Sequence, residues 1–164
     1  MTNLTQYFKK ALPLFAIAVP MLLLDILTKW IVQVNIQEGD SISVITGFFY
    51  LSHHRNSGAA FGILANQRIL LVLVTIAALI FIFVYSYRYR NSRWVQTALG
   101  FVLGGAVGNF IDRLFLGEVV DFLQFGIESK NLFWPTFNVA DVSVCIGAGM
   151  LIVYLFQFQK RNAN

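Results

Sequence analysis

The stretch that decides the fold is residues 69–87, which read ILLVLVTIAALIFIFVYSY and contain no charged side chain. An α-helix rises about 1.5 Å per residue, and a bilayer core about 30 Å thick takes about 20 residues to cross. This stretch is long enough to do so. We therefore interpret it as a transmembrane helix.

Three further segments share this length and apolar character. They are residues 12–34, 94–115 and 138–158, and the charges inside them are Asp25, Lys29, Asp112, Arg113 and Asp141. The third of the four spans also carries Gly104 and Gly108, a spacing that favours close helix packing. The sequence thus predicts a membrane all-α fold, in which residues 1–164 form one integral membrane domain with four spanning helices.

The composition supports this class and excludes most others. Hydrophobic residues make up 57% of the 164 positions, and charged residues 12%, about half the ~25% of soluble domains. A soluble domain of this size has too little interior for so many apolar side chains, which rules out a soluble enzyme, a nucleic-acid module and a disordered chain. The single cysteine, Cys145, rules out an intrachain disulfide and a multi-cysteine metal site, and we expect it to pack within the fourth span.

The first span could also be a cleaved signal peptide, because Lys9 and Lys10 precede it and the triplet 16–18 resembles a cleavage site. However, this triplet lies inside the apolar run, which continues through residues 21–24. We therefore expect the segment to be retained.

Lysine and arginine residues in short loops set the orientation of a multi-pass protein, because they stay on the cytoplasmic side. With both termini inside, the cytoplasmic charges are all basic: Lys9, Lys10, Arg88, Arg90, Arg93, Lys160 and Arg161. The outer charges have both signs: Arg55, Arg68, Lys130, Glu38, Asp40, Glu118 and Glu128. The sequence thus predicts cytoplasmic termini, and the net charge of +4 requires no nucleic-acid partner.

Two segments, residues 35–67 and 117–137, then lie on the outer side. Residues 41–51 alternate and are rich in strand formers, so we expect a small β-sheet on the membrane surface. Three phenylalanines make the first segment too apolar to stand free in water: Phe48, Phe49 and Phe61. The second segment carries aromatic rings suited either to a membrane-interface belt or to a substrate-facing surface: Phe122, Phe125, Phe133, Trp134 and Phe137.

Four aspartates fall near the outer ends of the spans: Asp25, Asp112, Asp121 and Asp141. A charged side chain within a span costs roughly 2.5–3.5 kcal/mol on insertion scales, so such residues are candidates for function. No carboxylate falls in a cytoplasmic segment. The acids are therefore expected to gather at one side of the membrane.

The partners of two of these acids can be predicted from spacing. Asp25 and Lys29 are four residues apart on one helix face, and we expect them to neutralise each other. Asn109, Asp112 and Arg113 share a face of the third span, and we expect Arg113 to hold its neighbour Asp112 ionised. This makes Asp112 a scaffold or a substrate clamp rather than a group that exchanges protons.

Asp121 and Asp141 have no basic residue within four positions in the sequence. Two acids close together in a poorly hydrated pocket do not both ionise, so one keeps a proton. Such a pair can activate water with one member and protonate a leaving amine with the other, as peptide-bond hydrolysis requires. Transporters that relay protons also use intramembrane acids, so composition alone leaves both functions open.

Other chemistries have less support. His53 and His54 are adjacent, without HExxH or a comparable metal spacing, and we interpret them as loop or interface residues. Lys29 has no serine on its own helix face for a Ser-Lys pair, and the GxSxG motif is absent. We therefore expect no metal site.

Five blocks, taken in order, resemble those of the bacterial lipoprotein signal peptidases (signal peptidase II, prolipoprotein signal peptidase). They are Asp25-Ile26-Leu27-Thr28-Lys29, Asn56-Ser57-Gly58-Ala59-Ala60-Phe61, the run from Gly104 to Arg113, Val119-Val120-Asp121-Phe122, and Phe137-Asn138-Val139-Ala140-Asp141. Each block alone is short. Their combination is specific and extends from the first span to the fourth.

The resemblance implies a membrane-embedded aspartic endopeptidase (a hydrolase) of the bacterial cytoplasmic (inner) membrane, with its site near the outer face and no cofactor. Its substrate would be a diacylglyceryl-modified prolipoprotein, cut just before the lipidated cysteine. By motif, Asp121 and Asp141 match the catalytic pair. Residues that match substrate-binding or supporting positions are Asn56, Gly105, Asn109, Asp112, Arg113, Asn138, Asp25 and Lys29. The resemblance also implies membrane-lipid contacts and inhibition by a globomycin-type cyclic peptide, and we expect a monomer.

Two alternatives from other classes remain at this point. One is a small proton-coupled membrane transporter subunit, and the other is a noncatalytic factor that binds lipoproteins. The first is disfavoured because the acids cluster on one side and residues 69–87 add no charge to a path across the membrane.

Overall fold

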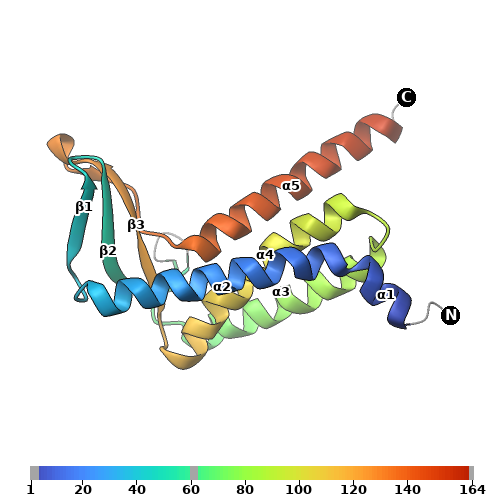
Figure 1. Ribbon diagram of the computed structural model, residues 1–164, viewed down its shortest axis with the longest axis horizontal. Helices are drawn as coiled ribbons and strands as arrows, with labels where there is room; N and C mark the ends of the chain where they lie inside the picture. Colours follow the sequence, from blue (N-terminus) through green and yellow to red (C-terminus); the bar gives the residue numbers. More distant parts are fainter. Residues whose placement is uncertain (1–3, 60–62, 163–164) are drawn as a thin grey trace.

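Figure 1 shows the computed structural model, which describes residues 4–59 and 63–162; Phe61 lies outside the described residues. In this part of the chain, four helices are long and apolar enough to cross a membrane. They are Leu12–Asn35 (α2), Arg68–Arg88 (α3), Arg93–Phe115 (α4) and Val139–Asn162 (α5). Their bounds agree closely with the predicted spans, which confirms four apolar helices.

A short helix that the sequence did not predict, α1 (Leu4–Lys10), precedes α2. Pro13 lies in the first turn of α2. Proline is tolerated there because the N–H groups of the first turn have no hydrogen-bond partner within the helix. The Tyr7 hydroxyl lies 3.1 Å from Ser86 Oγ, and Ser86 Oγ donates to Gln96 Oε1 at 2.8 Å. This buried polar cluster connects α1 to the hairpin of α3 and α4.

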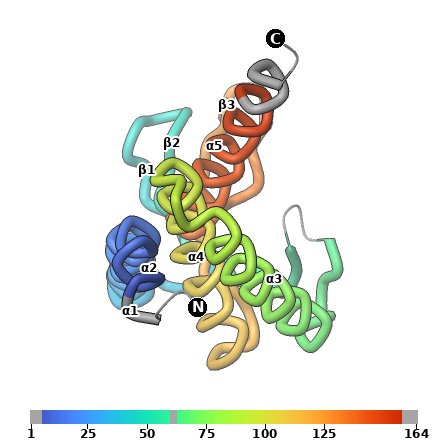
Figure 2. The backbone as a smooth tube through the Cα atoms, turned by 90° about the vertical axis from the view of Figure 1, so that its right-hand side faces the viewer, coloured from blue at the N-terminus to red at the C-terminus, as the bar shows by residue number. Residues whose placement is uncertain are grey.

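The central helix is α4, and α2, α3 and α5 all pack against it, as the end-on view in Figure 2 shows. Half of the α4 span is buried inside the protein, whereas the buried share is 22% for α2 and 17% each for α3 and α5. The three helices around α4 therefore present long apolar surfaces, as expected of helices that face lipid.

Glycines on α4 allow its neighbours to approach closely. A Cβ atom on Gly104 would lie 2.7 Å from the carbonyl oxygen of Ala18 on α2. A Cβ atom on Gly108 would collide with the carboxylate of Asp25, also on α2. The close helix packing predicted from the spacing of these two glycines is confirmed.

An antiparallel sheet, four-stranded within the described residues, lies where α2 and α4 end and α3 and α5 begin (Figure 1). Its strands follow the order β1 (Ser41–Ile45), β2 (Phe49–Asn56), β3 (Val119–Ile127) and β4 (Leu132–Phe133). A short 3-10 helix, η2 (Glu128–Lys130), separates β3 from β4. The β-strands predicted within residues 35–67 are confirmed. The contribution of residues 117–137 was missed because residues 119–122 are all buried, so no alternation marks that strand.

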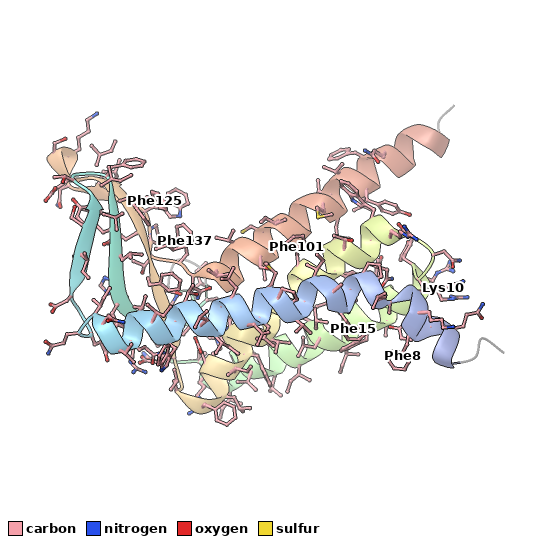
Figure 3. All side chains as sticks on the ribbon, in the orientation of Figure 1. Phe8, Lys10, Phe15, Phe101, Phe125 and Phe137 are labelled. Atoms are coloured by element: carbon pink, nitrogen blue, oxygen red, sulfur yellow. The ribbon has the colours of Figure 1, made fainter. Side chains whose placement is uncertain are left out.

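Aromatic rings cover part of the sheet. Phe49 stacks on Phe125 with ring centroids 4.6 Å apart, and Phe125 stacks on Phe137 at 6.0 Å. Figure 3 shows Phe125 and Phe137 on the side of the sheet that faces α5. Phe122 is instead buried in a core cluster with Val32 of α2. This ring therefore serves packing rather than an interface belt.

Candidate active site

The four predicted aspartates come from four different elements. Asp25 lies on α2, Asp112 on α4 and Asp121 on β3, and Asp141 is the third residue of α5. Three asparagine side chains and Lys29 connect all four carboxylates through hydrogen bonds and ion pairs. The expected clustering of the acids is confirmed.

Asp121 is held by its strand and by two amides. In the β2–β3 register it lies opposite His54, two residues from Asn56. Asn56 Nδ2 donates to its Oδ2 at 2.9 Å, and Asn138 Nδ2 donates to its Oδ1 at 2.7 Å. The residue is 2% exposed, and its pKa is raised from 3.8 to about 7 by this burial and, to a smaller extent, by the charge of Asp141, against the lowering effect of the Asn56 hydrogen bond. The carboxyl group is therefore partly protonated at neutral pH, as a general acid has to be.

Asp141 lies in the first turn of α5, where it shares a reciprocal cap with Asn138. Asn138 Oδ1 accepts the N–H of Asp141 at 3.0 Å, and Asp141 Oδ2 accepts the N–H of Asn138 at 3.1 Å. Asp141 Oδ1 accepts Nδ2 of Asn109 at 2.8 Å, and Asn109 Oδ1 in turn accepts Lys29 Nζ at 2.9 Å. The half-buried Asp141 also lies near the positive end of the dipole of α5.

Asn138 is fully buried and connects the two acids of the predicted pair. Its Nδ2 reaches Asp121, and it also lies 3.1 Å from Asn109 Oδ1 and 3.3 Å from the carbonyl oxygen of Val120. Its Oδ1 binds the backbone of Asp141. One amide group thus sets how the two acids lie relative to each other.

Lys29 lies between two carboxylates. Its Nζ is 2.7 Å from Asp25 Oδ2 and 2.8 Å from Asp112 Oδ2, so the expected Asp25–Lys29 pair is confirmed. Asp25 Oδ1 also accepts the N–H of Ala140 at 2.9 Å, and Asp112 Oδ2 accepts the N–H of Val120 at 3.2 Å. The carboxylates paired with Lys29 therefore bind the backbone next to both acids of the predicted pair: Asp25 binds it beside Asp141, and Asp112 binds it beside Asp121.

Arg113 does not neutralise Asp112, contrary to expectation. Its Nη2 donates to the carbonyl oxygen of Gly58 at 2.9 Å, and its Nη1 lies 3.4 Å from the carbonyl oxygen of Asn109. Asp112 pairs with Lys29 instead. Successive residues of a helix point about 100° apart, so adjacency in sequence did not give contact. In the structure, Arg113 connects the segment after β2 to α4.

Two glycines serve the geometry of the site. The N–H of Gly58 donates to Asn56 Oδ1 at 2.9 Å, which turns the Asn56 amide nitrogen toward Asp121. Gly105 lies against the start of α5, where a Cβ atom would collide with the carbonyl oxygen of Ala140. Its position supports close packing of α4 and α5 beside Asp141.

Among the described residues, the two histidines and the cysteine lie away from any metal-like cluster. His53 and His54, interpreted as loop or interface residues, lie on β2, which pairs with β3; His53 is buried with Nδ1 2.8 Å from the carbonyl oxygen of Ile36. Cys145 is exposed, because little of α5 is buried by other helices. In residues 4–59 and 63–162, no three His, Cys, Asp or Glu side chains gather as a metal site would require.

Sequence reasoning missed the role of Arg68, which it counted only as an outer charge. Arg68 Nε donates to the carbonyl oxygen of Arg113 at 2.7 Å, and Nη2 donates to that of Leu114 at 2.8 Å. These bonds satisfy carbonyl groups in the last turn of α4, which carries the site. An arginine at the start of a different helix offers no sequence signal for such a contact.

A family model described as signal peptidase (SPase) II matches residues 17–157. The lipoprotein signal peptidase of Halalkalibacterium halodurans is 42% identical over 148 residues, covering 90% of this chain and 94% of the relative. The lipoprotein signal peptidase of Bacillus subtilis is 45% identical over 142 residues, covering 86% and 91%.

Two solved structures of bacterial membrane enzymes, both determined by the in meso method, share the fold. The first, at 2.3 Å resolution, has a TM-score of 0.80 and 37% identity and covers 90% of each chain. The second, at 1.9 Å resolution, has a TM-score of 0.74 and 38% identity, covering 87% of this chain and 91% of the other.

Proposed function

We propose, from the premise that this chain belongs to the signal peptidase II family, that Asp121 and Asp141 are the catalytic pair with which it cleaves signal peptides from prolipoproteins. Family membership confirms the resemblance found in the five sequence blocks, and it makes the chain a membrane protease rather than a transporter. The observation that carries the assignment of the pair is the Asn138 amide, which binds the carboxylate of Asp121 at one end and the backbone of Asp141 at the other.

The proposed chemistry is general acid–base hydrolysis. The ionised member of the pair takes a proton from water, whose oxygen bonds to the scissile carbonyl carbon, while the protonated member gives its proton to the carbonyl oxygen. The C–N bond of the resulting diol then breaks as the leaving nitrogen takes a proton from the first member. The second member takes back a proton from the diol. A carboxyl group and a free amine result, and the pair returns to its starting state.

The chain is a multi-pass membrane protein, and we place its termini in the cytoplasm with the sheet on the outer surface. The four aspartates are at the sheet end of the bundle. Five described cations at the opposite end have the one-sided distribution typical of a cytoplasmic face: Lys9, Lys10, Arg88, Arg90 and Arg93. The site then lies near the outer face of the bacterial cytoplasmic (inner) membrane.

This placement suits a substrate that carries lipid. The acyl chains of a diacylglyceryl-modified cysteine stay in the bilayer, so a bond just before that cysteine is presented at membrane depth. The long apolar surfaces of α2, α3 and α5 are consistent with contacts to membrane lipid. We propose that residues 1–164 act as one domain and as a monomer, without a cofactor, and that a globomycin-type cyclic peptide inhibits by occupying the site between the sheet and the pair.

Purified protein incubated with a diacylglyceryl-modified precursor tests this function. We expect a single cut immediately before the modified cysteine, identified by mass spectrometry of the mature product. The matched control is the same precursor without the diacylglyceryl group, which should remain uncut. Cleavage of both precursors at the same rate would contradict the proposed substrate class.

A further inference from the structure

Two asparagines that contact Asp121 have amide orientations fixed by backbone groups. Asn56 Oδ1 accepts the N–H of Gly58, and Asn138 Oδ1 accepts the N–H of Asp141. A backbone N–H can only donate, so the Nδ2 group of each asparagine has to face its other partner. In both cases that partner is the carboxylate of Asp121.

Asn109 differs because its orientation depends on a side chain. Its Oδ1 accepts Lys29 Nζ at 2.9 Å, and an ammonium group can only donate. Its Nδ2 therefore faces Asp141, to which it donates at 2.8 Å. Asn138 Nδ2 also lies 3.1 Å from this oxygen, but that neutral donor is shared with the shorter bond to Asp121 and with Val120. Charge-assisted bonds are roughly twice as strong as neutral ones, so Lys29 contributes most to the orientation of Asn109.

We infer that Lys29 is a positioning residue for peptide-bond cleavage: it holds the Asn109 amide N–H on Asp141 and so keeps Asp141 as the ionised member of the pair. The inference rests on the proposed catalytic pair. An Asn109 amide turned the other way would present its oxygen to Asp141, and an acceptor in that place favours the protonated carboxyl group. Lys29 acts on the chemistry through Asn109.

The surroundings of the two acids agree with this division of roles. Asp141 is half-buried, accepts the backbone N–H of Asn138 and lies near the positive end of α5, so only donors are described around its carboxyl oxygens. Asp121 lies on a strand and is almost fully buried, and burial raises its pKa to about 7. Asp141 thus accepts the proton of water, and Asp121 donates to the carbonyl oxygen.

The charges around the pair allow a charge-matched test. The charged side chains near Asp121 and Asp141 are Asp25 and Lys29 on α2, and Asp112 and Arg113 on α4. Lys29 with its two carboxylate partners has one positive and two negative charges, a net charge of −1. In the double variant Lys29→Met/Asp25→Asn only Asp112 is charged, which is again −1. The donor to Asn109 is lost while the formal charge stays the same.

The experiment measures the pH dependence of kcat/KM on the diacylglyceryl-modified precursor. In Lys29→Met/Asp25→Asn we expect the acidic limb to move to higher pH by about one unit, because a hydrogen bond that favours the ionised form is lost. In Lys29→Gln/Asp25→Asn, which has equal side-chain length and charge but an N–H donor, the limb should stay closer to that of the parent. Lys29→Arg should leave it in place.

Melting in detergent separates positioning from stability. A double variant that melts at a lower temperature but has the parental pH profile would show a purely structural role and overturn the inference. If this variant does not fold, a shifted acidic limb in Lys29→Arg would overturn it equally. Failure of the catalytic pair is a different result, namely activity retained in Asp121→Asn or Asp141→Asn. In that case, infrared titration of the carboxyl band compares the parent with the double variant, and an unchanged titration contradicts the inference without any need for cleavage.

Discussion

The carboxylate of Asp25 accepts the backbone N–H of Ala140 at 2.9 Å, which attaches α2 to the residue immediately before Asp141. Asp112 makes the equivalent bond to Val120, the residue immediately before Asp121, at 3.2 Å. Because Lys29 pairs with both Asp25 and Asp112, one ammonium group connects the two backbone segments that carry the proposed catalytic pair. Two acids without a proposed role in proton transfer thus position the two that have one.

Asp121→Asn and Asp141→Asn should each lower cleavage of the lipidated precursor by about 10²- to 10⁴-fold, the usual contribution of a general acid or base. Asparagine is near-isosteric with aspartate, so insertion should change little, and Asp121→Asn should melt like the parent at acidic pH, where Asp121 carries its proton. Asp40→Asn, at an exposed position outside the site, is the matched control and should be fully active. Near-parental activity in either site variant would remove the pair from the mechanism.

The burial of Asp121 should make stability depend on pH. Its pKa is 3.8 when exposed and about 7 in the folded protein, so between these values the folded state binds more protons than the unfolded state. This contribution to stability is fully present below about pH 4 and is lost as the pH rises through about 7. The melting temperature of the parent should therefore fall relative to that of Asp121→Asn between pH 4 and pH 8. A parent that gains stability over this range would show that the carboxylate, not the acid, is favoured.

Asn138 combines a helix cap with a contact to Asp121, and two variants separate these roles. Asn138→Ala should lose about 0.5–2 kcal/mol of stability together with activity. Asn138→Ser keeps an oxygen that can cap α5 but has no amide group to reach Asp121, so it should recover stability without recovering activity. Melting and precursor cleavage, measured on the same preparations, check both expectations. A fully active serine variant would reduce Asn138 to a cap.

Gly105→Ala should impair the site through the backbone. The added Cβ would collide with the carbonyl oxygen of Ala140 and push the first turn of α5, with Asp141, away from α4. We expect a loss of about 1–3 kcal/mol, as in other overpacked interiors, and a marked loss of cleavage. Gly149→Ala on α5 is the control, since its Cβ would meet nothing within 4 Å. Equal behaviour of the two variants would contradict the packing account.

Arg113→Ala should affect activity more than stability. The guanidinium group contacts Gly58 and Asn109, while Asp112 keeps its partner Lys29. Arg113→Lys should restore activity only in part, because a point charge replaces a planar fork. Melting and cleavage of both variants provide the test. A large loss of stability with normal turnover per folded molecule would restore the view that Arg113 neutralises a buried acid.

The sequence predicted the features that depend on local pattern. Hydrophobic length predicted the four helices, and the i, i+4 spacing of Asp25 and Lys29 predicted their ion pair. The positions of four aspartates near the same ends of the spans predicted that these acids cluster. Each of these follows from helix geometry or from the cost of burying charge, both of which can be evaluated from one segment at a time.

The features that were missed depend on contacts between segments. Strand β3 lacks alternation because its first half is buried on both faces, and only pairing with β2 defines it. The predicted partner of Asp112, Arg113, was wrong because Lys29 of α2 forms the ion pair with Asp112 instead. The contact of Arg68 with the end of α4 joins residues 45 and 46 positions apart, which no local pattern encodes.

The two members of the pair are supplied by β3 and by α5, the last of the four apolar helices along the chain. This order has a consequence for biogenesis. A chain with only its first three spans inserted contains Asp121 without Asp141, and Asp25 without the backbone of Ala140. With this proposed pair, a protease that is made in the same membrane as its substrates should be inactive until its own insertion is complete.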